Sequence, residues 1–487
     1  MSESPRRTGY NDGMSGTIST PVTGGAETPE QALARAQAAA QAKRFNEAAG
    51  ICNDVLATSP DHASALALLG MVAAHTNDPE RGIIMLERAV SVRPGVASWY
   101  ANLSALYRMV YRMQDALRVG QEAIRLDPQN ADHLVNLSLV FTDVDDREHA
   151  IACLLRALGL KPEHADGHLA LGQNLLAMGD FEPGWKEYEW RNLTEAGKGT
   201  LPKMTSAAWN GMSIPNGRLL MVGDQGYGDT IQFARYIPLI ADRCQELILG
   251  CSAEMGPLLS TIPGVKQYCH RWTDVPGHAA HCRLSSVPYF VHTMPDTIPS
   301  QIPYLFADRT RVAEWRTKLG TMLPIRLPRV GLAWTGRPTH PNDRRRSIPL
   351  AHLAPLSSAG RMSFVSLQKP LLDRDKPSLS QFPGMTDISD DLKDFGETAA
   401  VIENLDLVIT VDTAMGHLAG ALGKPVWIML PKASDWRWLL QRSDSPWYPT
   451  ARLFRQQTPG AWDPVLQEVT AALKERLRIG AEGIAAN

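Results

Sequence analysis

The spacing of apolar and small residues divides the chain into a helical half and a half in which strands alternate with helices. From residue 31 apolar side chains recur at helical spacing, and prolines follow one another every 34 residues, at positions 60, 94, 128 and 162. Two columns of small residues keep the same step: Gly70, Ser104, Ser138 and Gly172, and Ala48, Gly82, Ala116, Ala150 and Gly184. This pattern predicts closely packed pairs of antiparallel helices, repeated along a solenoid.

The 34-residue period resembles that of the tetratricopeptide repeat (TPR), in which a proline closes each helical hairpin. The expected units are 29–62, 63–96, 97–130 and 131–164. A fifth, divergent unit from residue 165 lacks the closing proline and contains Trp185, Tyr188 and Trp190. We expect this unit to cap the solenoid and to dock on the next domain. The groove of such a solenoid usually holds a peptide or a protein, and by itself it implies no chemistry.

After about residue 200 the pattern changes to short apolar runs separated by helical or loop segments. The runs are RLLMVGDQ, ELILGC, PRVGLAW, MSFVSLQ, LDLVITVD and KPVWIML. They predict parallel, doubly wound sheets. The segment 323–329, which contains two prolines, divides this region into two Rossmann-like lobes whose strand ends would face one cleft. The predicted fold is therefore an α-solenoid followed by an α/β GT-B pair of lobes, with domains at 29–198, 199–325 and 326–487.

Composition narrows the classes of partner and the cellular location to be expected. The 487 residues carry a net charge of -2, which gives no reason to expect nucleic acid or an anionic membrane as a partner. Six cysteines lie without a CxxC pair, and no apolar run has the length of a membrane span, so we expect a cytoplasmic protein. Residues 1–28, rich in Ser, Thr, Gly and Pro, predict a disordered leader.

Three segments carry a more specific resemblance. GDQGYGDTIQFARYIP (223–238), GLAWTGRPTHPNDRRRSIPL (331–350) and VDTAMGHLAGALGKPVW (411–427) resemble bacterial TPR-linked glycosyltransferases related to the lipopolysaccharide heptosyltransferases. The architecture is also similar to that of O-GlcNAc transferase, whose sequence signatures are absent. The resemblance implies sugar transfer from a nucleotide-sugar co-substrate, with inversion and without a metal or another cofactor.

In the first segment, a glycine-rich turn follows a strand, and Asp229 lies at the start of a helix. A carboxylate there serves most simply as an N-cap. The resemblance implies a different role, in which Asp229 is the general base that takes the proton of the acceptor hydroxyl. Gln225, Gly228 and Gln232 are candidate substrate contacts in the same segment.

In the third segment, a buried strand runs into a small-residue turn and a helix at 414–422. Backbone N–H groups at a helix N-terminus bind phosphate, so this junction predicts a diphosphate site. The resemblance places the donor on Asp412, Thr413, Ala414, Met415, Gly416 and His417, although the heptosyltransferases have a glycine where Ala414 or Met415 stands. A lone His417 would more often be a core histidine, but its place one turn into this helix favours a phosphate contact.

The second segment supplies positive charge. Without a metal, a guanidinium must neutralise the departing nucleoside phosphate, and we assign this role to Arg346. The neighbouring Arg344 and Arg345 are expected at the surface. His340, Asn342 and Asp343 are further candidate substrate contacts. The aromatic residues of KASDWRW (432–438) would either stack on the nucleobase or pack internally. HAAHC (278–282) lacks a fourth ligand at usable spacing, so no metal is assigned.

Three functions remain open. The leading hypothesis is a glycosyltransferase that modifies Ser or Thr of a protein held by the TPR groove, with flagellin as one candidate acceptor. The second keeps the enzyme but makes the acceptor a lipid-linked glycan or another carbohydrate. The third is a non-catalytic TPR scaffold that binds a nucleotide.

Overall fold

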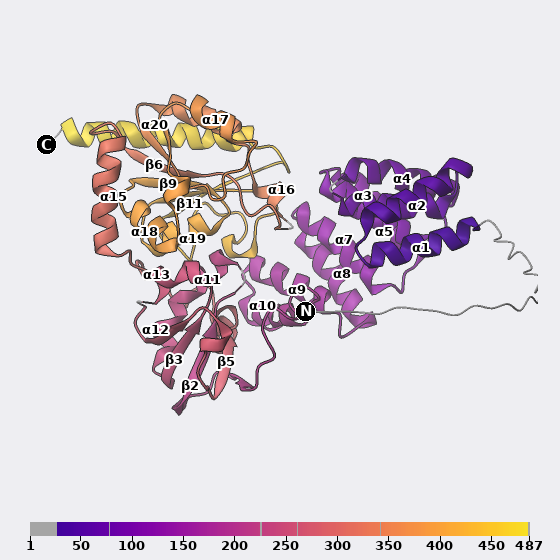
Figure 1. Cartoon of the computed structure of the whole chain (residues 1–487), viewed down its shortest axis with the longest axis horizontal. Helices are drawn as coiled ribbons and strands as arrows, with labels where there is room; N and C mark the ends of the chain where they lie inside the picture. The colour runs from indigo at the N-terminus through magenta and orange to yellow at the C-terminus, as the bar shows by residue number, and fades with distance from the viewer. Residues whose placement is uncertain (1–26, 77, 225, 261, 341, 486–487) are drawn as a thin grey trace, which may run out of the picture. The chain divides into compact units, whose positions relative to one another are not determined.

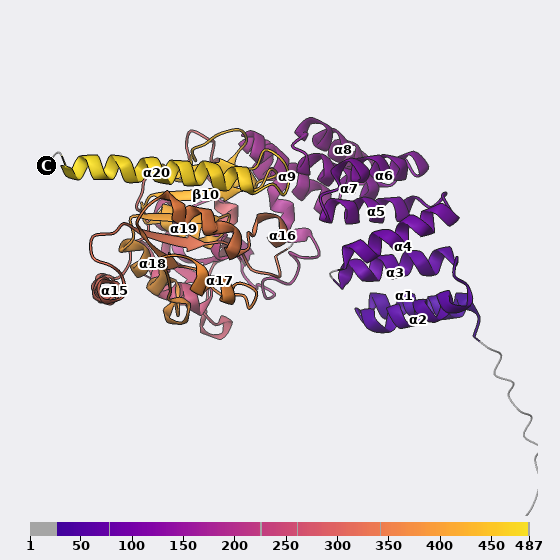
Figure 2. The ribbon, with the colours of Figure 1, turned by 90° about the horizontal axis from the view of Figure 1, so that it is seen from above.

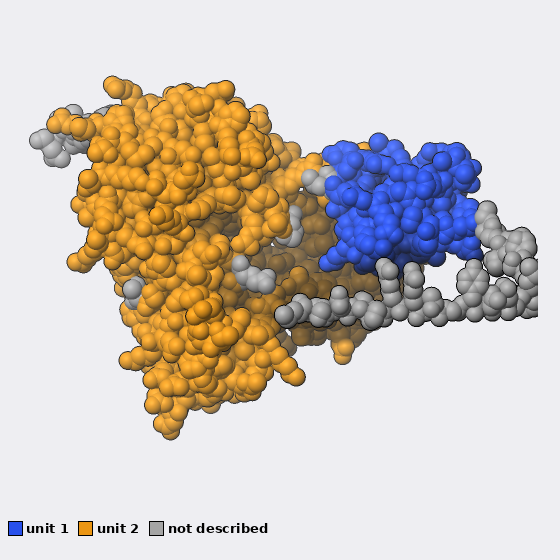
Figure 3. Space-filling model, viewed as in Figure 1, with its two compact units in different colours: residues 1–94 blue, residues 95–487 orange. Residues whose placement is uncertain are grey.

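The computed structural model describes residues 27–485 except 77, 225, 261 and 341, so nearly all of the predicted leader at 1–28 lies outside the described residues. Two compact units make up the chain, Met1–Pro94 and Gly95–Asn487, and Figure 3 colours them separately. The first unit contains helices α1 to α4. The second contains the remaining helices and both sheets.

Ten helices form five hairpins, each of which begins 34 residues after the one before it. The pairs are α1 (Pro29–Gln41) with α2 (Phe45–Thr58), α3 (Ala63–His75) with α4 (Pro79–Val92), α5 (Ala97–Met109) with α6 (Met113–Leu126), α7 (Ala131–Asp143) with α8 (Arg147–Leu160), and α9 (Ala165–Met178) with α10 (Phe181–Tyr188). The proline of each of the first four units lies two residues beyond the second helix of its pair, where a helix-breaking residue is tolerated.

The small-residue columns lie where the paired helices touch. A Cβ added at Gly70 would lie 3.0 Å from the carbonyl oxygen of Gly82, and one at Gly172 would lie 2.6 Å from the backbone nitrogen of Tyr188. Ser104 donates its hydroxyl to the carbonyl oxygen of Ala116 at 2.8 Å. The predicted reason for the repeated small residues, close approach of antiparallel helices, is therefore confirmed.

The first α/β lobe contains a parallel sheet in the order β1-β5-β2-β3-β4. Its strands are β1 (Ala207–Ala208), β2 (Ile214–Val222), β3 (Cys244–Gly250), β4 (Val265–Cys269) and β5 (Ala280–Arg283). Its helices are α11 (Tyr227–Phe233), α12 (Ile237–Ala241), α13 (Gly256–Leu259) and α14 (Val287–Phe290). The motif HAAHC runs into strand β5, where His281 bonds to the Ser206 hydroxyl at 2.9 Å.

The second lobe follows α15 (Arg309–Met322) and contains a parallel sheet in the order β8-β7-β6-β9-β10-β11. Its strands are β6 (Arg329–Ala333), β7 (Ser363–Ser366), β8 (Met385–Asp387), β9 (Leu407–Val411), β10 (Val426–Leu430) and β11 (Ala451–Arg455). Numbered along the lobe, this order is 3-2-1-4-5-6, that of the Rossmann fold. Ligands of such sheets bind where the order reverses, at the carboxyl ends of β6 and β9.

Alternate side chains along the strands of this sheet point to opposite faces, and each face is covered by a layer of helices. Leu407, Ile409 and Val411 pack in the same core as α20 (Asp463–Ala485), whereas Val408 packs in the core shared with α18 (Phe395–Glu403) and α19 (Ala414–Ala421). Figures 1 and 2 show α20 on one face of the sheet and α18 and α19 on the other. The short helices α16 (Asp343–Arg346) and α17 (Lys376–Gln381) lie in the connections after β6 and β7.

The last helical hairpin shares a hydrophobic core with both lobes. Trp185 of α10 is 2% exposed and donates its indole N–H to the carbonyl oxygen of Thr293 at 2.9 Å. Its ring meets that of Trp436 edge-on, with centroids 5.2 Å apart. The divergent fifth unit therefore docks on the lobes through its aromatic side chains.

The predicted fold class is confirmed: helical repeats are followed by two parallel α/β sheets, as in GT-B proteins. Strands β1, β4, β5, β8 and β11 escaped prediction because they lack a continuous apolar run. Throughout the described segments, no helix has both the length and the apolar character needed to cross a membrane.

Candidate functional site

The site predicted for the donor lies where the strand order of the second lobe reverses. The loop after β6 leads to Arg346, and Asp412 and Thr413 follow β9 directly. Because β6 and β9 are hydrogen-bonded neighbours, both loops leave the same edge of the sheet side by side. The fold therefore brings together two segments that are 66 residues apart in the sequence.

Arg346 joins these two loops. Its Nη1 donates to the carbonyl oxygen of Asp412 at 2.8 Å, and its Nε lies 3.9 Å from Oδ1 of Asp343. This Nε is buried and has no hydrogen-bond partner among the described residues. A buried N–H group of a guanidinium without a partner is suited to an anionic ligand.

Gly336 leaves room for Arg346 beside the end of β6. An added Cβ at Gly336 would lie 2.5 Å from Nη2 of Arg346. The buried Asp343 accepts from the Ser347 hydroxyl at 2.8 Å, and that hydroxyl accepts from the backbone N–H of Gly336 at 3.1 Å. These contacts order the loop around the arginine.

The turn after β9 is capped by its own threonine. Thr413 is the N-cap of α19; its hydroxyl accepts from the Met415 N–H at 3.3 Å, and its carbonyl accepts from the Gly416 N–H at 3.0 Å. The cap thus engages both amides in this structure, and the diphosphate site at the start of α19 stays a prediction.

Asp229 is the third residue of α11 and faces the second lobe. Among the described residues no side chain caps α11, so the simpler N-cap role expected for Asp229 is not what the structure shows. Its Oδ1 accepts a hydrogen bond from Nη2 of Arg437. Burial raises the pKa of the Asp229 carboxyl to about 6, although the nearby Arg437 lowers it. A carboxylate with such a pKa is a stronger base than an ordinary aspartate.

Arg437 is the central residue that the sequence did not reveal. Besides Asp229, it donates from Nε to Oε1 of Gln232 at 2.5 Å and from Nη1 to Oδ1 of Asp435 at 2.6 Å. Burial alone would lower its pKa, but Asp229 and Asp435 hold that pKa well above the usual value. The only signal was a single arginine within KASDWRW, after the carboxyl end of β10.

A charged cluster results at the junction of the lobes. Asp412 belongs to it, because burial and the charge of Asp435 raise the pKa of its carboxyl, whereas Arg346 and Arg437 lower it. Asp229, Asp412 and Asp435 thus lie within electrostatic reach of Arg437 at the carboxyl ends of the strands. Such a cluster can hold a phosphate and accept a proton within the same small volume.

His417 belongs to α19, and its ring lies against α11. Its Nδ1 and the Tyr448 hydroxyl are 2.9 Å apart, and its ring stacks on Trp438 at a centroid distance of 5.3 Å. Burial lowers its pKa well below the usual value, so the imidazole is neutral. An added Cβ at Gly228 would lie 2.8 Å from Cδ2 of His417, which shows how closely the two helices approach. Contact of His417 with a phosphate stays a prediction.

The other candidate substrate contacts differ in how far they are buried. Gln232 is fully buried and its oxygen is bound by Arg437, whereas Gln225 lies outside the described residues. His340 is exposed, and its Nδ1 accepts from the backbone N–H of Asn342 at 3.1 Å. Of the two alternatives for the aromatic residues of KASDWRW, Trp436 and Trp438 follow internal packing, because both indoles are buried in the core.

A cavity of about 250 Å³ opens at the carboxyl edge of the first lobe. Trp272 at its wall is 46% exposed, and Arg283 also faces it. The carboxylate of Asp224 accepts from the backbone N–H of Ser285 at 3.0 Å and from its hydroxyl at 2.5 Å. Asp224 follows β2 and leads into the turn that carries Asp229, so this cavity and the charged cluster share one segment.

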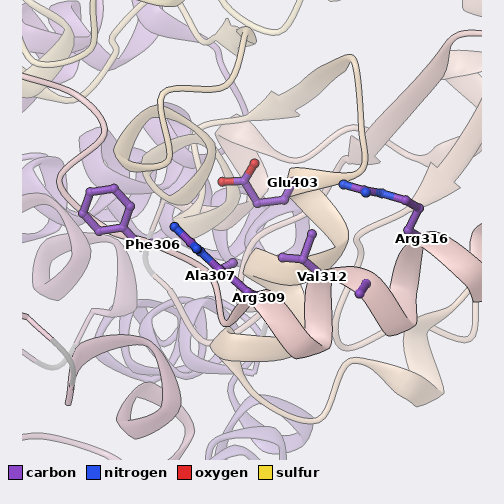
Figure 4. Close-up of a pocket in the computed structure, with 7 residues that line it drawn as sticks. Phe306, Ala307, Arg309, Val312, Arg316 and Glu403 are labelled. Atoms are coloured by element: carbon purple, nitrogen blue, oxygen red, sulfur yellow. The ribbon is translucent and has the colours of Figure 1, made fainter.

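A second hollow, of about 440 Å³, lies along α15 (Figure 4). Phe306, Arg309, Arg316 and Glu403 line it, and none of the residues of the charged cluster does.

Comparisons with known proteins match two segments of the chain to family models. A family model described as glycosyltransferase family 9 (heptosyltransferase) matches residues 393–430, which carry α18, β9, α19 and β10. The chain is similar to family 9 glycosyltransferases in this segment. A tetratricopeptide repeat model matches residues 131–164, the α7 and α8 hairpin.

Similar proteins include a curated relative and solved structures. Protein FlbA of Caulobacter vibrioides is 26% identical over 489 residues, which covers 86% of this chain and 80% of FlbA. Among solved structures, MamA is 22% identical with a TM-score of 0.30, and covers 34% of this chain and 97% of its own. A thermophilic TPR protein of Thermus thermophilus, TTC0263, is 21% identical with a TM-score of 0.32, and covers 35% of this chain and 92% of its own.

The chain therefore joins tetratricopeptide repeats to a glycosyltransferase-like region. Family 9 implies a nucleotide-sugar donor, and the repeats indicate protein binding.

Proposed function

We propose that the protein transfers a sugar from a nucleotide-sugar to a Ser or Thr hydroxyl of a protein acceptor bound by its repeats. The observation that carries this proposal is the placement of Asp229, with a pKa of about 6, against Arg437 of the other lobe, beside the loops that bear Arg346 and Asp412. Asp229 is suited to take a proton, and Arg346 and Arg437 are suited to hold a phosphate. The family 9 match and the TPR match support the two halves of the proposal.

In the proposed reaction, Asp229 takes the proton of the acceptor hydroxyl as its oxygen attacks the anomeric carbon. The bond from that carbon to the donor phosphate breaks, and the electron pair leaves with the nucleotide. Arg346 and Arg437 stabilise the negative charge that develops on this leaving group. Attack from the side opposite the phosphate inverts the anomeric centre. No step of this scheme uses a metal.

A carbohydrate acceptor is the second candidate, and one observation favours it. The exposed Trp272, with Arg283 and Asp224, lines the cavity at the carboxyl edge of the first lobe. An exposed indole offers a flat apolar face, and charged neighbours can bond to hydroxyl groups. This cavity would accept a lipid-linked or free glycan, whereas flagellin as a protein acceptor stays a prediction of the sequence alone.

The testing experiment is a thermal-shift panel of ADP-, UDP-, GDP- and CMP-sugars on the full chain, followed by a transfer assay with the one that binds. A ligand of the native state raises the melting temperature by mass action. Purified flagellin and a free oligosaccharide are then offered as acceptors, and the product is located by mass spectrometry. Failure of all four donors to shift the melting temperature would overturn the proposal, and transfer to the oligosaccharide alone would favour the second candidate.

A further inference from the structure

Asp143, the last residue of α7, holds together two parts of the second unit. Its carboxylate is 4% exposed and lies between two arginines. Oδ2 accepts from Nε of Arg108, on α5, at 2.5 Å, and Oδ1 accepts from Nη1 of Arg345, on α16 of the second lobe. Arg345 was expected at the surface, and this ion pair corrects that expectation.

Two weaker contacts join the same surfaces. The Tyr111 hydroxyl, in the turn between α5 and α6, donates to the carbonyl oxygen of Arg344 at 3.4 Å. Nζ of Lys432, in the loop after β10, lies 3.8 Å from a carboxylate oxygen of Asp145. The turns of two helical hairpins thus contact two loops at the carboxyl edge of the second sheet, and Asp143 provides the most buried of these contacts.

Helix α16 is so short that the contact with Asp143 affects the orientation of its other side chains. With four residues, α16 is a single turn, and so short a helix has little stability without tertiary contacts. Consecutive side chains of a helix point in different directions. Arg345 accordingly reaches the repeats while Arg346 reaches the carbonyl oxygen of Asp412. Fixing Arg345 therefore also fixes the direction in which Arg346 points.

Removing the charge of Asp143 would disturb this arrangement strongly. Arg108 and Arg345 both bond to the one carboxylate, so without it two poorly exposed guanidinium groups would repel each other. Arg108 lies on the longer helix α5, whereas Arg345 lies on a single-turn helix. The repulsion would therefore displace α16 rather than α5.

We propose that Asp143 is a positioning residue for the donor site: the repeats, through Asp143 and Arg345, set the orientation of Arg346 and with it the affinity for the nucleotide. The inference rests on the proposed function, in which Arg346 binds the donor phosphate. It gives the repeat domain a second role besides binding the acceptor.

The test is a double-mutant cycle on the full chain. Binding of ADP, UDP, GDP and CMP is measured by calorimetry, and the tightest binder serves as the probe. Asp143→Asn should weaken its binding about tenfold, and Arg346→Ala at least as much. The double variant should bind no more weakly than Arg346→Ala alone, because Asp143 acts through Arg346. Asp115→Asn is the matched control, since it removes a carboxylate paired with Arg112 and Arg118 within the repeats, and it should leave binding unchanged.

The outcomes separate the two claims. If Arg346→Ala weakens binding but Asp143→Asn does not, or if the losses multiply in the double variant, this inference is wrong and the donor site stands. If no nucleotide binds the wild type, or Arg346→Ala binds as the wild type does, the proposed function fails and this inference fails with it. Should Asp143→Asn not fold, as judged by circular dichroism, Arg345→Gln tests the same link while keeping the pair of Asp143 with Arg108.

Discussion

Asp229 and Arg437 pair across the two lobes, although they are 208 residues apart in the sequence. Asp229 extends from the first turn of α11 in one lobe, and Arg437 follows the end of β10 in the other. Because Arg437 also binds Asp435, its charge is shared between two carboxylates. Burial of the Asp229 carboxyl outweighs the charge of Arg437 and raises its pKa to about 6, so Asp229 can take up a proton near neutral pH.

Replacing the carboxylate of Asp229 should lower the rate of the reaction without weakening nucleotide binding. Asp229→Asn should lower kcat by about 100-fold or more, because the amide keeps the shape but cannot accept the proton. Nucleotide affinity should stay close to that of the wild type. Nucleotide release gives kcat, and calorimetry gives the nucleotide affinity. The control is Asp435→Asn, which removes the other carboxylate of Arg437; an equal loss of kcat in that variant would show that charge around Arg437 matters, and that Asp229 is no base.

The raised pKa of Asp229 predicts an acidic limb in the pH profile. The base is active when deprotonated, so kcat/KM should rise through a midpoint of about pH 6 and level off above it. Initial rates in overlapping buffers provide the measurement. An imidazole also titrates in this range, so His340→Gln is the control, and it should keep the limb if Asp229 causes it. A profile that is flat around pH 6 would contradict this assignment.

Removal of Arg346 should act on the donor in both the ground state and the transition state. Arg346→Ala is expected to weaken nucleotide binding about tenfold or more and to lower kcat as well, since a charge-assisted hydrogen bond is lost. Arg344→Ala serves as the control on the same helical turn, because the Tyr111 contact uses the backbone of Arg344 and survives the substitution. Equal effects of the two variants would mean that only the overall charge of the loop counts.

Deletion of the first unit tests the role of the repeats. A chain that begins at Gly95 keeps the second unit whole, so it should fold, as judged by circular dichroism, and bind nucleotide as the full chain does. Transfer to a protein acceptor should fall, because the docking that raises the local acceptor concentration has lost two hairpins. Undiminished transfer would show that residues 1–94 do not bind the acceptor.

A chain that begins near residue 200 is not an equivalent control. Such a cut removes Trp185 and Tyr188 and uncovers the ring of Trp436, which they contact. It also releases Arg345 from Asp143. A truncation at residue 200 would therefore disturb the docking of the last hairpin and the donor site as well as acceptor binding.

Periodic features of the fold could be predicted from the sequence because they depend on local contacts. The 34-residue step places every hairpin, and Gly70 and Gly172 lie where helices touch. The strands with continuous apolar runs, such as β9 and β10, could also be predicted, because a strand buried on both faces requires such a run.

The site was predicted only in part, because its central contacts are not local. Arg437 gains its role from Asp229, Gln232 and Asp435, two of which lie in the other lobe. The partner of Arg345 is 202 residues away, and a run of three arginines reads most simply as a solvated loop. The indoles of Trp436 and Trp438 resemble a base-stacking pair in sequence, but the packing of the last hairpin and of His417 uses them.

The shared aromatic core also bears on synthesis of the chain. Residues 1–94 emerge from the ribosome before the second unit and can complete their own contacts. Phe233, which Trp185 contacts, is made soon after it, but Trp436 and Trp447 are made much later. Until then the apolar face of α10 stays partly uncovered, and exposed apolar surface of this kind promotes aggregation. The last hairpin thus depends on residues of both lobes for its burial, and its core is complete only when β10 and the segment after it have been made.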